Sequence, residues 1–132
     1  MKKIIAAFAS DEGELLIERH FGDAERYSIY QISPSDAVYL KEVENLTVLE
    51  EEVHADPRKA KGVAGLLKKN GVQAAVSKVF GPNIEKIKKH FVCVIVNGGT
   101  VKNSIGMIQE NFDAITQQWE KGESRDSLDL RK

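Results

Sequence analysis

The residue best suited to chemistry in this 132-residue chain is a histidine in a short glycine-containing motif. His20, Phe21 and Gly22 stand between two extended segments, where a loop is expected. A neutral imidazole nitrogen can ligate iron or another borderline metal. A single surface histidine is more often an ordinary polar loop residue, and the local sequence alone favours that simpler interpretation. His54 stands just before a predicted helix and is either a second metal ligand or a solvated loop residue.

Two glycine-containing loops are candidates for holding an anion or a cofactor. One contains Gly81 and Pro82, and the other contains Gly98, Gly99 and Thr100. Each loop is predicted to join a strand to a helix, where glycine lets a ligand approach the backbone and the helix offers unpaired N–H groups. Both can equally be turns and caps, because Thr is a good N-cap residue and neither loop has a phosphate-binding or dinucleotide-binding pattern.

The other chemically active residues do not form the pattern of an enzyme. The acidic residues within 11–14 lie in a turn-like stretch, and those at 50–52 form a charged run typical of a solvated surface. His90 ends a predicted helix, where a cation suits the helix dipole. Cys93 stands in an apolar segment, where cysteine is usually a small buried hydrophobe. We therefore expect the chain to have no catalytic activity.

Composition limits the environment and the partners of the protein. Hydrophobic residues make up 42% and charged residues 30% of the chain, as in a soluble globular domain. The 19 basic and 20 acidic residues nearly balance, so no overall field attracts nucleic acid or an anionic membrane. The apolar run at 4–9 is too short for a signal peptide or a membrane span. Because a single cysteine excludes an internal disulfide, we expect a cytoplasmic protein.

The periodicity of apolar residues predicts an α/β fold with three layers. Strands are predicted at 3–9, 15–18, 26–32, 38–48, 73–80 and 92–96, and helices at 56–69, 83–90 and 101–119. The first half reads as antiparallel, whereas alternating strands and helices in the second half require parallel pairing. We expect one domain over residues 1–119, with a mixed sheet between two helical layers. Residues 120–132 are charged and are predicted to be a flexible tail.

The order of these motifs resembles the dinitrogenase iron-molybdenum cofactor-binding family. The similarity covers roughly residues 2–112, and His20-Phe21-Gly22 is its most specific part, followed by the Gly81-Pro82 turn. This resemblance implies a ribonuclease H-like α/β/α fold with a mixed five-stranded sheet. It also implies a non-catalytic protein that binds, stores or delivers iron-sulfur precursors of the nitrogenase cofactor.

The resemblance further implies a ligand set and a type of cargo. His20 is the favoured ligand of an iron-sulfur or iron-molybdenum cluster, and His54 has the place of a frequent second histidine. The cluster is expected to be bound transiently and exchanged with donor and acceptor proteins. This chain has Asp23 where many members have a basic residue, and an acidic side chain disfavours an anionic cluster. The alternative is a regulatory or scaffold module that binds an anionic small ligand or a partner protein in the same crevice.

Overall fold

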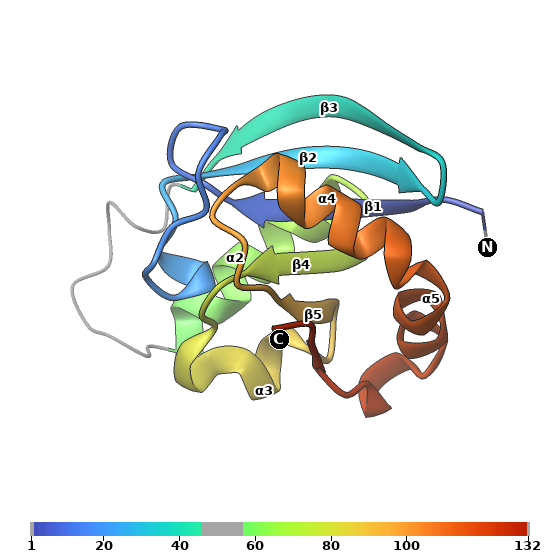
Figure 1. The fold of residues 1–132 in the computed structure, drawn as a ribbon. Coiled ribbons are helices and arrows are strands. Elements are labelled where there is room, and N and C mark those ends of the chain that lie inside the picture. Colours follow the sequence, from blue (N-terminus) through green and yellow to red (C-terminus); the bar gives the residue numbers. More distant parts are fainter. Residues whose placement is uncertain (1, 46–56, 132) are drawn as a thin grey trace.

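A six-stranded mixed sheet forms the centre of the protein, and the computed structural model describes residues 2–45 and 57–131. The strand order is β3-β2-β1-β4-β5-β6 (Figure 1). The strands are β1 (Ile4–Ala9), β2 (Arg26–Ser33), β3 (Asp36–Glu44), β4 (Ala74–Ser77), β5 (Val92–Ile95) and β6 (Leu128–Asp129). The strands β1, β2 and β3 pair antiparallel, whereas β1, β4, β5 and β6 run parallel. The predicted mixed sheet is therefore confirmed.

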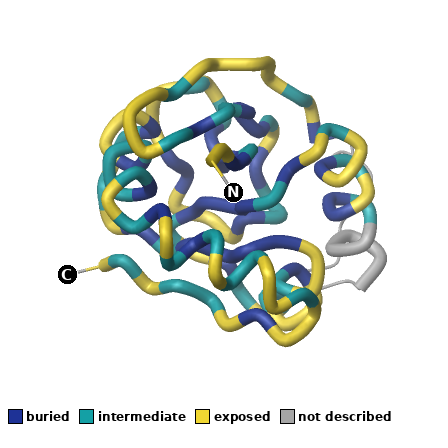
Figure 2. The backbone as a smooth tube through the Cα atoms, turned by 90° about the vertical axis from the view of Figure 1, so that its right-hand side faces the viewer, coloured by how far each residue is buried: buried dark blue, intermediate teal, exposed yellow. Residues whose placement is uncertain are grey.

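Helices cover both faces of the sheet. They are α2 (Pro57–Lys69), α3 (Ile84–Ile87), α4 (Val101–Glu110) and α5 (Phe112–Glu120), with short 3-10 helices η1 (Phe21–Asp23), η2 (Gly81–Asn83) and η3 (Gly122–Ser124). Side chains of β1 alternate between the faces: Ala7 and Ala9 join the core beneath α2 and α3, and Ala6 and Phe8 join the core beneath α4 and α5. Buried segments accordingly run through the middle of the molecule (Figure 2). The predicted three-layer α/β/α arrangement is confirmed.

The C-terminal segment differs from the prediction of a flexible tail. Leu128 and Asp129 add a sixth strand beside β5, so the sheet has one strand more than the five expected. Arg125, only 6% exposed, lies over the Trp119 ring at 4.3 Å and donates hydrogen bonds to the carbonyls of Lys89 and Trp119. A two-residue strand has no periodicity, and the pairing of β6 with β5 and the contact of Arg125 with Lys89 join residues distant in sequence, so the local pattern could not predict them.

The predicted helix over 101–119 is two helices in the structure. Asn111 separates α4 from α5 with φ −113° and ψ 23°, and its side-chain amide donates to the Met107 carbonyl. Asparagine competes in this way with backbone hydrogen bonding. The apolar stripe continues across the break, because Ile108, Phe112 and Ile115 are all buried against the sheet. No helix in the described part of the chain is long and apolar enough to cross a membrane.

Candidate functional site

The candidate site lies at the edge of the sheet where the parallel strands end. The strands β1, β4 and β5 all run toward this edge, and ligands in open α/β sheets bind beyond such carboxyl ends. The long segment between β1 and β2 returns along it and carries His20. Val79, just after β4, forms an isolated parallel bridge with His20, and its carbonyl accepts a 2.8 Å hydrogen bond from the Phe21 N–H.

The His20 ring packs directly on the backbone of Gly81. A Cβ atom built on Gly81 would lie 2.6 Å from His20 Cγ and 2.7 Å from Cε1, so only glycine leaves room for the ring. Gly81 also has φ +76°, which favours glycine. The structure thus brings together the two strongest motifs of the sequence. Pro82 is exposed and provides the first turn of η2, where its fixed φ is well suited.

One edge of the His20 imidazole is turned toward the protein. Its Nδ1 lies 3.9 Å from Asp23 Oδ2, and it is also the ring atom nearest the would-be Cβ of Gly81. The side chain as a whole remains 46% exposed. Metal-bound histidines commonly present one ring nitrogen to the metal while the other faces a carboxylate or a carbonyl. In His20 the nitrogen that faces a carboxylate is Nδ1, so Nε2 is the candidate nitrogen for a ligand.

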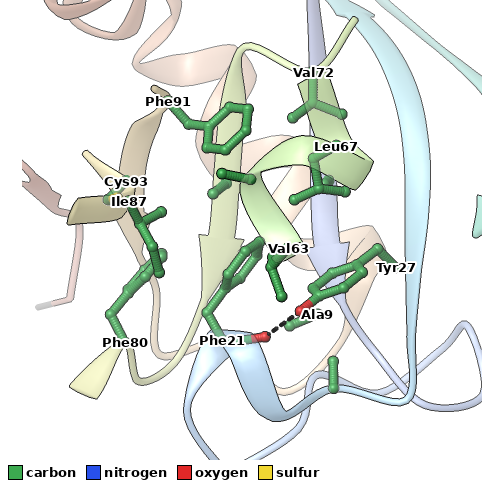
Figure 3. Packing of buried hydrophobic residues seen from close by; sticks show 14 of the residues in the cluster. Ala9, Phe21, Tyr27, Val63, Leu67, Val72, Phe80, Ile87, Phe91 and Cys93 are labelled. Atoms are coloured by element: carbon green, nitrogen blue, oxygen red, sulfur yellow. Dashed lines mark hydrogen bonds between the residues drawn. The ribbon is translucent and has the colours of Figure 1, made fainter. Parts of the chain in front are cut away.

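Phe21 fixes this histidine from beneath. Its ring is fully buried, stacked on Phe80 with centroids 5.2 Å apart, and it lies 4.9 Å from the Tyr27 ring. The Tyr27 hydroxyl donates a 2.7 Å hydrogen bond to the Phe21 carbonyl (Figure 3). Burial raises the pKa of Tyr27 well above 10, which keeps the hydroxyl a neutral donor. The side chain of Phe21, the middle residue of the His20-Phe21-Gly22 motif, therefore anchors that motif in the core.

Asn45 is a positioning residue of the site that the sequence did not reveal. Its side-chain nitrogen approaches the carbonyls of Gly22 and Ala24 at 3.0 and 2.9 Å and the Tyr27 hydroxyl at 3.3 Å. The residue is 2% exposed and follows β3 directly. Asn45 therefore ties the turn after His20 to the sheet. An asparagine after a strand is ordinary in sequence, so no local signal could have identified it.

The second glycine-containing loop, residues 98–100, forms hydrogen bonds with another segment of the chain. Gly99 accepts a hydrogen bond from the Leu16 N–H at 3.0 Å, and the Val101 N–H donates to the Glu14 carbonyl at 2.8 Å. The Thr100 side chain caps α4 by accepting from the Asn103 N–H at 3.0 Å, as predicted. The segment 14–16, not His20, lies against this loop. Thr100 therefore caps α4, and the N–H groups of Val101 and Asn103 at the start of that helix already have partners within the chain.

Charged side chains near His20 are largely paired with one another. Arg19 contacts Asp11 at 2.7 Å, and Lys78 contacts Glu18 at 3.2 Å. With Asp23 beside His20, this edge carries more acidic than basic side chains among these residues. The side chains of Arg19 and Lys78 are thus already paired with carboxylates, and His20 is the side chain best placed to bind a ligand here.

Among the described residues, no other histidine or cysteine joins His20. His54 lies outside the described residues. His90 comes just before β5, at the opposite end of the parallel strands from His20. Burial and the neighbouring Lys68 lower the pKa of His90. Within the described ranges, no group of three or more His, Cys, Asp or Glu side chains could hold a metal ion. Any metal bound at His20 would need its remaining ligands from elsewhere.

Cys93 is expected to be chemically silent in the folded protein. Burial raises the pKa of its thiol to about 12, from an ordinary value of 9.0, so the reactive thiolate is scarce at neutral pH. We expect a thiol reagent such as dithionitrobenzoate to label the native protein far more slowly than the urea-unfolded chain. Rapid labelling of the native protein at neutral pH would show that Cys93 is accessible.

Known proteins share this fold and this sequence pattern. The sequence profile described as dinitrogenase iron-molybdenum cofactor matches residues 2–111. A crystal structure of a Methanocaldococcus jannaschii protein, described as a candidate dinitrogenase, has a TM-score of 0.60 and 21% identity over 84% of this chain and 92% of that one. An NMR structure of a Thermotoga protein, described as a candidate NifB protein of the DUF35 family, has a TM-score of 0.54 and 21% identity over 86% and 89%. No curated protein matches. Because the profile match spans most of the chain and includes the His20 and Gly81 motifs, the chain belongs to the dinitrogenase iron-molybdenum cofactor family.

Proposed function

We propose that the protein is a non-catalytic carrier that binds an iron-sulfur or iron-molybdenum-type cluster through His20 Nε2. Its exchange partners would be cluster donor and acceptor proteins of the cytoplasm. The observation that supports this proposal most is the position of the His20 ring. The ring is half exposed, its Nδ1 edge faces Gly81 and Asp23, and its backbone is held by the bridge to Val79.

The small number of ligands supports a carrier rather than a permanent metalloprotein. Structural metal sites are closed by several protein ligands, which hold the metal tightly. The described residues offer His20 without two further side chains of a ligating type nearby. A cluster held by His20, or by His20 together with His54, which lies outside the described residues, would keep its other positions open to a donor or acceptor protein. Binding of this kind is readily reversible, as delivery requires.

A regulatory or scaffold module remains the second candidate, and exposed apolar side chains favour it. Leu15 is 57% exposed and Val79 38% exposed, and both lie on segments at the His20 edge. Apolar side chains exposed beside a candidate ligand suit a protein that docks over the site. A carrier also needs such a surface for its donor and acceptor, so docking alone does not separate the two functions.

Anaerobic reconstitution of the purified protein separates the two functions. The protein is incubated with iron, sulfide and molybdate, desalted, and then assayed for bound metal and for cluster absorbance. We expect substoichiometric to stoichiometric cluster that is lost on adding an apo-acceptor or a chelator, because few ligands hold it. A protein that retains no metal after reconstitution would exclude the carrier and favour the regulatory module.

A further inference from the structure

The outer edge of β3 combines open backbone groups with exposed apolar side chains. β3 is the terminal strand of the sheet, beyond which no strand of the described chain pairs (Figure 1). Val38, Tyr39 and Leu40 are 44%, 55% and 42% exposed, and they follow one another directly. In the described chain the only other exposed large hydrophobic side chains are Leu15 and Val79, which lie apart from β3. A long apolar edge strand is a template for pairing with another strand.

The register of β3 against β2 fixes which side chains share a face. Val38 lies opposite Gln31, Tyr39 opposite Tyr30 and Lys41 opposite Ile29, so Leu40 is the extra residue of a bulge. Because Ile29 packs beneath α2 and Tyr30 packs toward α4, the alternation continues onto β3. Asp36, Val38 and Lys41 accordingly lie on the α2 face. Ala37 and Tyr39 lie on the α4 face, where the Tyr39 ring is 5.5 Å from that of Tyr30.

We propose that β3 pairs antiparallel with β3 of a second copy of this chain, about a twofold axis at Val38. In this register Val38 faces its own copy, and Ala37 of each chain faces Tyr39 of the other. Because Leu40 is the extra residue of the bulge, Asp36 of each chain faces Lys41 of the other chain. All of these pairs join side chains on the same face, as antiparallel pairing requires. A register centred one residue later would lose the contact between Asp36 and Lys41.

The other terminal strand of the sheet, β6, is a poorer template for pairing, which favours β3 as the partner of β3. β6 has two residues, and Asp129 there is paired with Arg131 at the surface, so this edge is a poor template. Pairing of β3 with β3 uses the same surface on both chains and closes after two copies. Charged residues beyond the bulge, Glu42 and Glu44, limit the paired segment to about 36–41. The two six-stranded sheets then form one continuous sheet with both His20 sites accessible.

Sedimentation equilibrium across micromolar to millimolar protein tests this dimer. We expect the mass to rise from monomer to dimer with a dissociation constant weaker than about 1 µM, because this short edge buries less than a standard interface. Asp36→Lys and Lys41→Asp should each raise the dissociation constant about tenfold, since each creates two like-charge pairs. The doubly substituted chain restores opposite charges and should return to within about threefold of wild type.

Matched variants separate this interface from a general effect of charge. Glu120→Lys and Lys121→Asp make the same charge changes at the end of α5 and should leave the dissociation constant unchanged. Val38→Lys places two cations at the twofold axis and should leave the protein monomeric, with unchanged circular dichroism because the side chain is exposed. A wild-type protein that stays monomeric throughout, a double variant that is not restored, or an unaffected Val38→Lys variant would each overturn the proposal.

Discussion

Replacing His20 by alanine is expected to remove the cluster absorbance that the wild-type protein acquires on anaerobic reconstitution. Bound iron should fall to the level of a sample that was never reconstituted, because no group of three ligating side chains is available elsewhere in the described residues. The loss of stability should be below about 1 kcal/mol, since the ring is half exposed and the backbone bridge to Val79 does not depend on it. Retention of wild-type iron by a folded variant would exclude His20 as a ligand.

A second substitution tests whether the position of the ring matters as well as its presence. In Gly81→Ala the new methyl group would occupy the space of the His20 ring, which must turn away. We expect cluster affinity to fall at least tenfold although His20 is intact, because the displaced ring loses the packing on Gly81 that holds its Nδ1 edge toward the protein and so orients Nε2. Alanine at φ +76° adds roughly 1 kcal/mol of backbone strain, so stability must be measured in parallel.

Gly122→Ala is the matched control for that backbone strain. Gly122 has φ +63°, and nothing lies within 4 Å of its would-be Cβ, so the strain is present without the clash. This variant should lose similar stability and keep wild-type cluster affinity. Equal losses of affinity in both variants would attribute the effect of Gly81→Ala to the fold. Wild-type affinity in Gly81→Ala would show that the packing of the ring on Gly81 is irrelevant.

The fold was largely predictable because its main elements have strong local patterns. The apolar stripe that includes Ile108, Phe112 and Ile115 predicted a helical layer on the sheet, and the structure has that layer. The break at Asn111 was missed because asparagine interrupts the backbone without interrupting the stripe. The strand at Leu128 and Asp129 was missed because two residues cannot show a period. Features that depend on one residue or on a distant partner have no periodic signal.

The same distinction applies to the candidate site. The sequence singled out the His20 motif and the Gly81-Pro82 turn separately, but the packing of the His20 ring on Gly81 joins residues far apart in the chain and was not predicted. The cap by Thr100 follows from residue type, but the pairing of its loop with residues 14–16 is non-local and was not predicted. The buried amide of Asn45 bonds to residues 18 to 23 positions away in the sequence, so no local pattern could predict its role. Sequence reasoning therefore found the exposed chemical group and missed much of its support.

That support is expected to carry the largest effect on stability. Phe21→Ala removes a fully buried ring stacked on Phe80 and beside Tyr27, and such substitutions cost about 3–5 kcal/mol through lost burial and the remaining cavity. Because domains of this size are stable by only about 5–15 kcal/mol, the variant is expected to be marginally folded. Urea denaturation of Phe21→Ala and of the milder Phe21→Leu gives the free energies of unfolding.

Phe8 provides the control that separates stability from the site. It is also fully buried, but it packs in the other core, beneath α4 and α5, with its ring 5.6 Å from Tyr30. Phe8→Leu and Phe21→Leu should lose comparable stability, yet only Phe21→Leu should weaken cluster binding when both proteins are measured well below their melting temperatures. The reason is that Phe21 is adjacent to His20 in the chain and positions the His20 ring against Gly81. Equal weakening by both variants would mean that binding follows global stability, and Phe21 would then have no particular role in positioning His20.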